Sequence, residues 1–163
     1  MQAKGPKVQP WLHGVLKDYD FTIFRDDKMI GVDFRMLPQI IERMQQRGLY
    51  AAYPVHPRDV IAEMADSMPQ PRYYAQRERI TKFVAEELEK GFKPRMPVHY
   101  GCNVIVRDMS HLDTKPSGDL WMRYIERCGI QDQISFHFAA QAYPKILAIG
   151  QEFGFRKSEC PIP

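Results

Sequence analysis

A strand, a helix and a second strand follow one another in the first third of the chain. Residues 19–25 are mostly β-branched or aromatic, residues 37–47 place apolar side chains at helical spacing, and residues 49–55 are again apolar. Pro38 suits the first turn of the helix, and Gly48 suits its end. This order is typical of a βαβ unit with two parallel strands. We therefore expect an α/β fold with a mainly parallel sheet and helices on both faces.

Further elements are predicted on either side of this unit. The sequence predicts helices over residues 6–17, 59–68, 73–90, 116–128 and 130–142, and strands over residues 103–107 and 144–149. Residues 29–32 are a candidate for one more short strand, and residues 151–163 are expected to be a loose tail. Residues 1–163 are thus expected to form a single α/β domain with its core in residues 18–150.

Charge and composition limit the classes of function. Lys and Arg outnumber Asp and Glu by only 23 to 20, so nucleic acid binding is not indicated. The sequence has no apolar run of about 18 residues and no apolar segment after its basic start, so we expect neither a membrane span nor a secretory signal. The three cysteines are widely spaced and indicate neither a metal site nor a disulfide framework, which makes the cytoplasm the expected compartment. The sequence also lacks phosphate-binding glycine loops, paired metal-binding histidines and serine nucleophile motifs.

Carboxylates stand at the ends of two predicted elements. Asp26 and Asp27 end the first strand, and ligands of open α/β sheets bind beyond the C-terminal ends of strands, within reach of a metal or a sugar. The simpler interpretation is that both residues form a turn. Asp132 begins the last long helix, where its alternative role is that of an N-cap contributing about 1 kcal/mol.

A second polar group follows the second predicted strand. His56 and Arg58 come directly after residues 49–55, and the planar Arg58 guanidinium can bind phosphate at two points. The alternative for Arg58 is a surface ion pair with Asp59 or Glu63. Because strand ends and helix starts meet at one edge of an open sheet, we expect His56 and Arg58 to share a crevice with the carboxylates at positions 26 and 132.

Six short signatures occur in a characteristic order between residues 7 and 138. They are Lys7 with Pro10; Tyr19-Asp20 with Ile23 and Asp26; His56-Pro57-Arg58 with Glu63; Val104-Ile105-Val106-Arg107; Trp121; and Asp132-Gln133 with Ser135 and Phe136. In this order they resemble a family of bacterial and plant glycosyltransferases that was long catalogued as a domain of unknown function. That family has the nucleotide-sugar-binding fold called GT-A, of which this chain resembles a truncated form. The resemblance implies transfer of a sugar from a nucleotide sugar to a glycan or another acceptor.

The resemblance also implies roles for individual residues. Asp26 and Asp132 would be the catalytic carboxylates. Asp26, helped by Asp27, would hold a divalent cation, Mn²⁺ or Mg²⁺, on the donor diphosphate. Substrate contacts are implied for His56, Arg58, Arg107, Trp121 and Gln133.

The sequence departs from the family pattern in two ways. The family's acidic motif has a carboxylate two places after its first, where this chain has Lys28. The family also places nucleotide-binding strands before the segment that begins here near Lys7, so we expect a second copy or a partner chain to cover the edge of strand 19–25. Three interpretations follow: a minimal transferase, one half of a split enzyme, or an inactive remnant that binds a glycan, a nucleotide or a protein.

Overall fold

The computed structural model describes residues 4–27, 29 and 34–150. Its strands are β1 (Phe21–Arg25), β2 (Ala51–Pro54), β3 (Val104–Asp108) and β4 (Ile146–Ile149). Its α-helices are α1 (Gly5–Val8), α2 (Leu37–Arg47), α3 (Val60–Ser67), α4 (Pro71–Tyr74), α5 (Arg77–Glu89), α6 (Thr114–Cys128) and α7 (Asp132–Ala142). The 3-10 helices are η2 (Pro10–Leu12), η3 (Gly14–Asp18) and η4 (Phe34–Met36). The tail 151–163 and the candidate strand 29–32, apart from Met29, lie outside the described residues.

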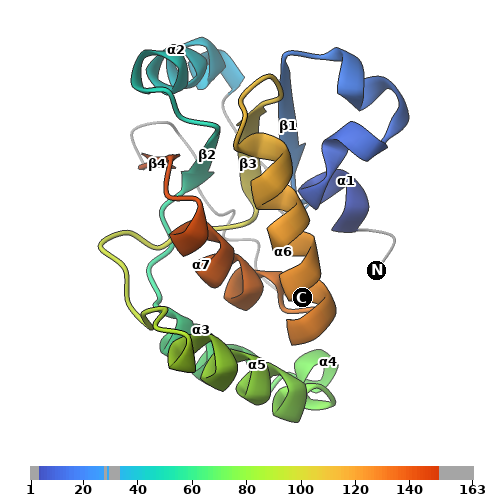
Figure 1. Cartoon of the computed structure of the whole chain (residues 1–163), viewed down its shortest axis with the longest axis vertical. Helices are drawn as coiled ribbons and strands as arrows, with labels where there is room; N and C mark the ends of the chain where they lie inside the picture. Colours follow the sequence, from blue (N-terminus) through green and yellow to red (C-terminus); the bar gives the residue numbers. More distant parts are fainter. Residues whose placement is uncertain (1–3, 28, 30–33, 151–163) are drawn as a thin grey trace, which may run out of the picture.

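The four strands form one mixed sheet in the order β1-β3-β2-β4 (Figure 1). β3 is antiparallel to both β1 and β2, and only β2 and β4 pair in parallel. The prediction of a mainly parallel sheet is therefore wrong, although its three strand segments do lie in one sheet. β1 and β2 run in the same direction, as a βαβ unit requires, but β3 lies between them. The chain leaves β2 at its C-terminal end and, after α3, α4 and α5, re-enters the sheet at that same end, so β3 must run the opposite way.

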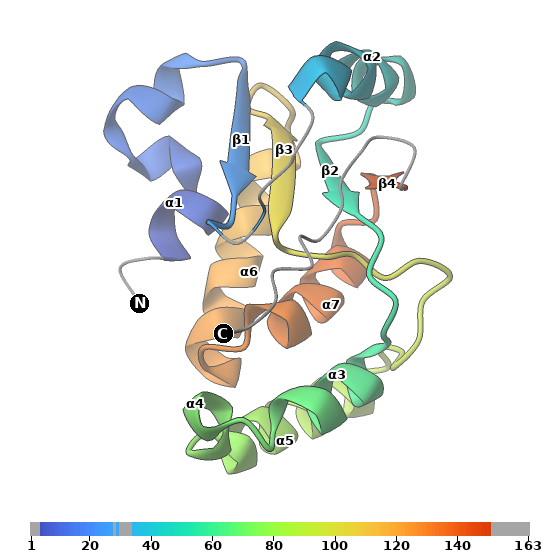
Figure 2. The same ribbon diagram turned by 180° about the vertical axis from the view of Figure 1, so that it is seen from behind.

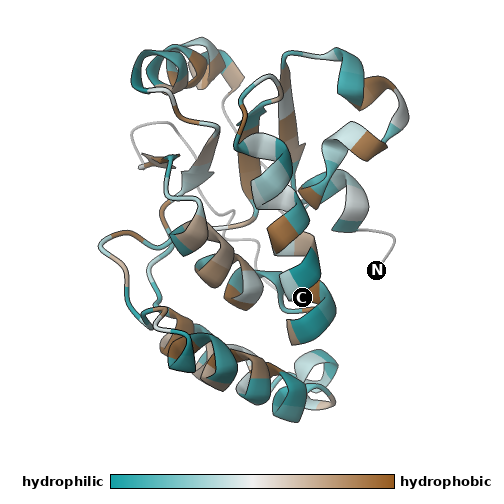
Figure 3. Cartoon of the chain, in the orientation of Figure 1, coloured by the Kyte–Doolittle hydropathy of each residue, from teal (hydrophilic) through white to brown (hydrophobic). Residues whose placement is uncertain are grey.

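Helices cover both faces of the sheet, as predicted. Successive residues of a strand point to opposite faces, and Tyr53 of β2 accordingly joins the larger core with α5, α6 and α7. Its neighbour Ala52 packs on the other face against Ile40 and Met44 of α2. Figures 1 and 2 show α2 apart from the pair α6 and α7, and Figure 3 shows hydrophobic and hydrophilic segments alternating along the helices. Helix α2 buries one side only, whereas α7 is buried on all sides over residues 134–140.

The predicted helix over residues 6–17 is wrong, since this segment forms the three short helices α1, η2 and η3. Pro10 has no backbone N–H to continue a helix, and Gly14 adopts a φ of 41° that belongs to the left-handed region. The segment instead packs closely on α6 at Gly118. A Cβ atom added to Gly118 would lie only 2.5 Å from the Val8 carbonyl oxygen. This close approach fixes α1 beside the start of α7.

The other predicted helices are present with changed limits. The helix expected over residues 73–90 is interrupted between α4 and α5, where the Gln76 side chain accepts a hydrogen bond of 3.1 Å from the Ile130 N–H. The last long helix begins at Asp132, but its N-cap is Gln131, whose side-chain oxygen accepts from the Gln133 N–H at 3.2 Å. Within the described residues, no helix has the length and apolar character needed to cross a membrane.

Candidate functional site

A pocket of about 480 Å³ opens where β1 and β2 end and β3 begins. Because β3 runs between these strands in the opposite direction, β1 and β2 are parallel and their C-terminal ends lie at the same end of the sheet. Helices α1, α3 and α4 and the start of α7 supply the remaining walls. Asp26, His56, Arg58 and Asp132 all line this pocket, so the prediction that these four side chains meet in one crevice is confirmed.

The inner wall of the pocket carries a chain of alternating charges. The Asp132 Oδ2 atom lies 2.6 Å from Lys4 Nζ and 2.8 Å from Lys7 Nζ. The Lys7 ammonium also lies 3.8 Å from Asp26 Oδ1 and 5.0 Å from the centre of the Phe24 ring. Lys7 is buried, with only 5% of its side chain exposed, whereas 41% of the Asp26 side chain is exposed. The two predicted catalytic carboxylates are therefore joined by a buried lysine.

This arrangement gives the two carboxyl groups opposite pKa shifts. Burial raises the pKa of Asp26, and the Lys7 ammonium offsets this only in part. Burial also opposes ionisation of Asp132, but the ammonium groups of Lys7 and Lys4 outweigh it and lower the pKa. Burial alone would lower the pKa of Lys7, yet Asp132 and its other neighbours raise it. At neutral pH Asp132 is thus a fixed carboxylate, and Asp26 is the stronger base of the two.

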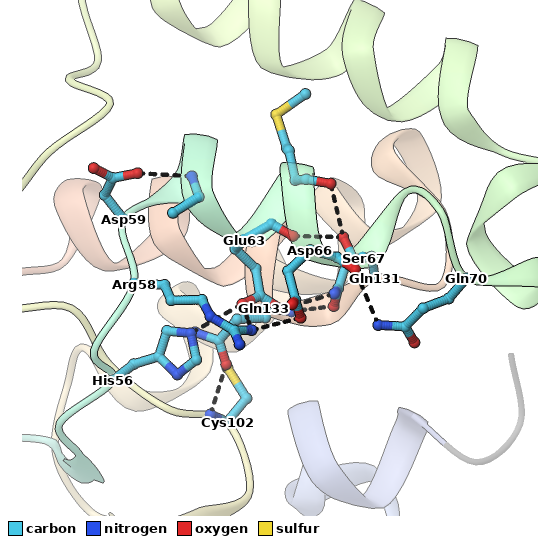
Figure 4. A network of polar contacts seen from close by, with 12 residues as sticks. His56, Arg58, Asp59, Glu63, Asp66, Ser67, Gln70, Cys102, Gln131 and Gln133 are labelled. Carbon is cyan, nitrogen blue, oxygen red and sulfur yellow. Dashed lines mark hydrogen bonds and ion pairs between the residues drawn. The ribbon is translucent and has the colours of Figure 1, made fainter.

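Glu63 of α3 organises the opposite wall of the pocket (Figure 4). Its Oε2 atom lies 3.0 Å from His56 Nε2, and its Oε1 atom accepts a hydrogen bond of 3.0 Å from Gln131 Nε2. Ser67 donates to the Glu63 backbone carbonyl at 2.7 Å. Glu63 therefore links the end of β2 to the start of α7.

Arg58 lies on the open side of this wall. Its Nη1 atom is 2.6 Å from Asp66 Oδ2 and 3.5 Å from Glu63 Oε2. The alternative interpretation of Arg58, an ion pair with Glu63, is thus present, while Asp59 instead caps α3 by accepting from the Ala62 N–H at 2.8 Å. Arg58 also lines the pocket, and 43% of its side chain is exposed.

Gln133 lines the pocket, but its amide is already used. Its oxygen accepts from the Cys102 N–H at 3.1 Å, and its nitrogen donates to the Tyr100 carbonyl. These bonds hold the segment that leads into β3 against α7. Gln133 therefore shapes the pocket by positioning this segment.

Two residues with implied substrate contacts lie in the core instead. Arg107 is 2% exposed and lies near the Tyr53 hydroxyl and the Trp121 ring. Trp121 is 1% exposed and donates from Nε1 to the Asp132 carbonyl at 3.3 Å and to Ser135 Oγ at 3.1 Å. Neither side chain lines the pocket. Trp121 supports the first turn of α7, on which Asp132 stands.

The carboxylates of the pocket do not fit the expected divalent cation. Asp27, the second implied ligand, is exposed and does not line the pocket. In the chain as described, no group of three or more His, Cys, Asp or Glu side chains is arranged to hold a metal ion. Lys7 already occupies the space between Asp26 and Asp132.

Three important residues of the site were not predicted as site residues: Lys7 and Glu63 belong to the signatures but had no assigned role, and Lys4 was not singled out. Lys4 and Lys7 are spaced as neighbours on one helical turn, and this pair of basic residues on either side of Pro6 was the available signal. Glu63 stands seven positions after His56, on the same side of α3 as Ser67. Its burial became evident only from the packing of α3 against α7.

Comparisons of the chain with protein-family models, with curated proteins and with solved structures gave no match. The geometry of the pocket and the resemblance of the short signatures are therefore the features that bear on function.

Proposed function

We propose that this protein is a glycosyltransferase-like protein whose pocket binds a sugar for transfer to an acceptor. The observation that carries the proposal is the meeting of Asp26, His56, Arg58 and Asp132, from segments far apart in the sequence, around one pocket large enough for a sugar. The resemblance to the GT-A family implies catalytic or substrate-binding roles for the same four residues.

The charge balance of the pocket supports a sugar as its ligand. Four carboxylates on its walls (Asp26, Glu63, Asp66, Asp132) are matched by four cations (Lys4, Lys7, Arg58, Arg72), counting Lys4 through its ion pair with Asp132. The amides of Gln70 and Asn103 add hydrogen-bond donors and acceptors. Such a lining offers many hydrogen bonds and no net charge, which suits the hydroxyl groups of a sugar better than a bare diphosphate.

The two carboxylates suit different tasks in sugar transfer. Because its pKa is raised and its side chain is half-buried, Asp26 is the better candidate to accept a proton from an acceptor hydroxyl. Asp132, with its lowered pKa, is a weak base but a permanent hydrogen-bond acceptor for sugar hydroxyls. His56, held at Nε2 by Glu63, would contact the sugar from the opposite wall.

A nucleotide-sugar donor needs a further surface for its diphosphate, and the edge of β1 is the proposed place. In the described part of the chain β1 pairs with β3 alone, so its other edge is available for a strand of a second copy or of a partner chain. Asp26 directly follows β1, so an added strand would end beside the pocket. Sedimentation of the purified chain over a range of concentrations tests self-association. A monomer at every concentration would contradict pairing with a second copy, and a different partner chain would then be the proposed partner for the free edge of β1.

The test of the proposed function is a binding and transfer assay. Neutral oligosaccharides and uridine, guanosine and thymidine diphosphate sugars are screened by saturation-transfer NMR, and each ligand found is then followed for transfer. Asp26→Asn should lower transfer by roughly 100-fold or more while leaving the melting temperature nearly unchanged, since a half-exposed carboxylate contributes little to packing. Asp20→Asn is the matched control, because Asp20 is an exposed carboxylate at the other end of β1. Equal loss of transfer in both variants, or failure of every sugar to bind, would refute the proposal.

A second candidate is an inactive remnant that binds a glycan without transferring it. The observation that favours it is that each of the four pocket carboxylates already has a cationic partner within 4 Å. This candidate predicts sugar binding that Asp26→Asn leaves unchanged, and no transfer with any donor. The same two assays therefore separate the candidates.

A further inference from the structure

Lys7 is a buried cation fixed between two carboxylates of the pocket. Its ammonium lies 2.8 Å from Asp132 Oδ2 and 3.8 Å from Asp26 Oδ1. The rest of the side chain is held by burial, with 5% exposed, and by contact with Phe24. The backbone of α1 is in turn fixed by its close packing at Gly118. Both the backbone and the ammonium group of Lys7 are therefore fixed in position.

We propose that the Lys7 ammonium stands in the position of a divalent cation between Asp26 and Asp132, so that the pocket binds its sugar without metal. Sugar-binding carboxylate pairs that use Mn²⁺ or Mg²⁺ present free oxygens to the ion. Here both carboxylates are already paired, and Lys4 adds a second positive charge on Asp132. A divalent ion would have to approach within a few ångströms of two ammonium groups, which repel it in a partly buried site.

The same geometry gives Lys7 a part in ligand binding. An ammonium group has three N–H donors, and one of them is hydrogen-bonded to Asp132 at 2.8 Å, whereas Asp26 at 3.8 Å is an ion-pair partner beyond hydrogen-bond distance. Lys7 lines the pocket, so we assign a donor that Asp132 does not use to a sugar hydroxyl. In this arrangement Lys7 both neutralises the two carboxylates and contacts the sugar, which are two tasks that a bound metal ion performs elsewhere.

Binding of Mn²⁺ alone tests the inference, by electron paramagnetic resonance of the free ion. The wild-type protein should bind no Mn²⁺ at the pocket. Lys7→Met, which keeps an apolar side chain and removes the charge, should gain one Mn²⁺ site that the wild type lacks, at least roughly tenfold tighter than any residual binding of Mn²⁺ elsewhere on the wild-type surface. Lys4→Met is the matched control: it also removes a cation from Asp132 but leaves Lys7 between the carboxylates, so it should gain no such site.

Two further measurements make the result decisive. Asp132→Asn in the Lys7→Met background should remove the gained site. In the wild-type protein, amide NMR signals near Asp26 and Asp132 should show no broadening by Mn²⁺, a measurement that does not depend on whether Lys7→Met folds. Broadening of these signals, or a folded Lys7→Met protein without a new Mn²⁺ site, would overturn the inference.

The inference depends on the proposed function only in assigning a sugar to the pocket. The Mn²⁺ measurements use no sugar, so absence of sugar binding would refute the proposed function and leave the assignment of Lys7 to be judged by the metal alone.

Discussion

Two carboxylates in this protein are buried between pairs of cations, yet their surroundings differ. Asp132, with 13% of its side chain exposed, pairs with two lysines of the N-terminal segment. Glu87 of α5, with a fully buried side chain, lies 2.6 Å from Lys90 Nζ and 2.7 Å from Arg127 Nη1. In both cases burial opposes ionisation, and the cationic partners nevertheless lower the pKa. Burial and pKa direction alone therefore do not distinguish the two residues.

What separates the two clusters is what they face. Arg127 belongs to α6, so the Glu87 cluster joins two helices that pack on each other. Asp132 lines the pocket, and its partner Lys7 extends the cluster to Asp26 at the end of β1. Arg127 and Lys90 also line smaller pockets, but Glu87 itself is not among their lining residues. The difference is that the buried carboxylate of the Asp132 cluster is itself exposed to a pocket, together with other polar groups.

The largest expected effect comes from removing the two buried carboxylates in turn. Asp132→Asn should cost about 3 kcal/mol of folding free energy, because Lys7 is then buried with only the more distant Asp26. Glu87→Gln should cost about 2 kcal/mol, because Arg127 keeps its second ion pair with Glu86. Only Asp132→Asn should also abolish sugar binding. Urea denaturation and ligand titration of both variants provide the measurement.

Glu89→Gln provides the control for this pair, since Glu89 is an exposed carboxylate on the same helix as Glu87. It should change the free energy of unfolding by less than about 0.5 kcal/mol. The comparison fails if Glu87→Gln weakens sugar binding as much as Asp132→Asn does.

A smaller effect is expected from pH, through two stacked histidines beside the pocket. The rings of His99 and His137 lie 5.2 Å apart at an interplanar angle of 11°. Burial lowers the pKa of each below the ordinary value of 6.5. For His99, His56 and Arg95 add to this lowering and Asp59 opposes it. For His137, the bond to the Lys93 carbonyl and Asp59 oppose it, and His99 adds to it.

The direction of the pH dependence follows from these shifts. A histidine with a lowered pKa in the folded state takes up its proton more readily when unfolded, so its contribution is complete above about pH 6.5 and is lost as the pH falls through the folded-state pKa. Melting temperature should therefore decrease from pH 7 to pH 5, and His137→Gln should reduce that slope. His13→Gln, at a partly buried position outside the stacked pair, is the control and should leave it unchanged. A slope that His137→Gln leaves intact would contradict the assignment.

The smallest expected effect on stability is at the rim of the pocket. The Arg58 and Asp66 side chains are 43% and 47% exposed, and exposed ion pairs contribute roughly 0 to 1 kcal/mol. Arg58→Gln should thus leave the urea midpoint almost unchanged and still weaken sugar binding severalfold, because Arg58 faces the pocket. Arg77→Gln, at an exposed position on α5, should change neither quantity. An Arg58→Gln protein that binds sugar normally would exclude Arg58 from the site.

Local patterns in the sequence predicted most of the elements and part of the site. Apolar spacing located α2, α3, α6 and β4, because helix and strand periods depend on residues only a few positions apart. The rule that ligands bind at strand ends selected Asp26 and His56 correctly as residues of one pocket. Both successes depend on information contained within short segments.

Strand order and the charged cluster were decided by the tertiary structure alone. β3 lies between β1 and β2, a position that no local pattern encodes. It runs antiparallel to both because the long connection through α3, α4 and α5 re-enters the sheet at the end it left. Lys7 and Asp132 are 125 positions apart in the sequence, and their contact depends on the packing of α1 against α6 at Gly118. An ion pair of this kind forms only when the folded backbone brings the two charges together and excludes water around them.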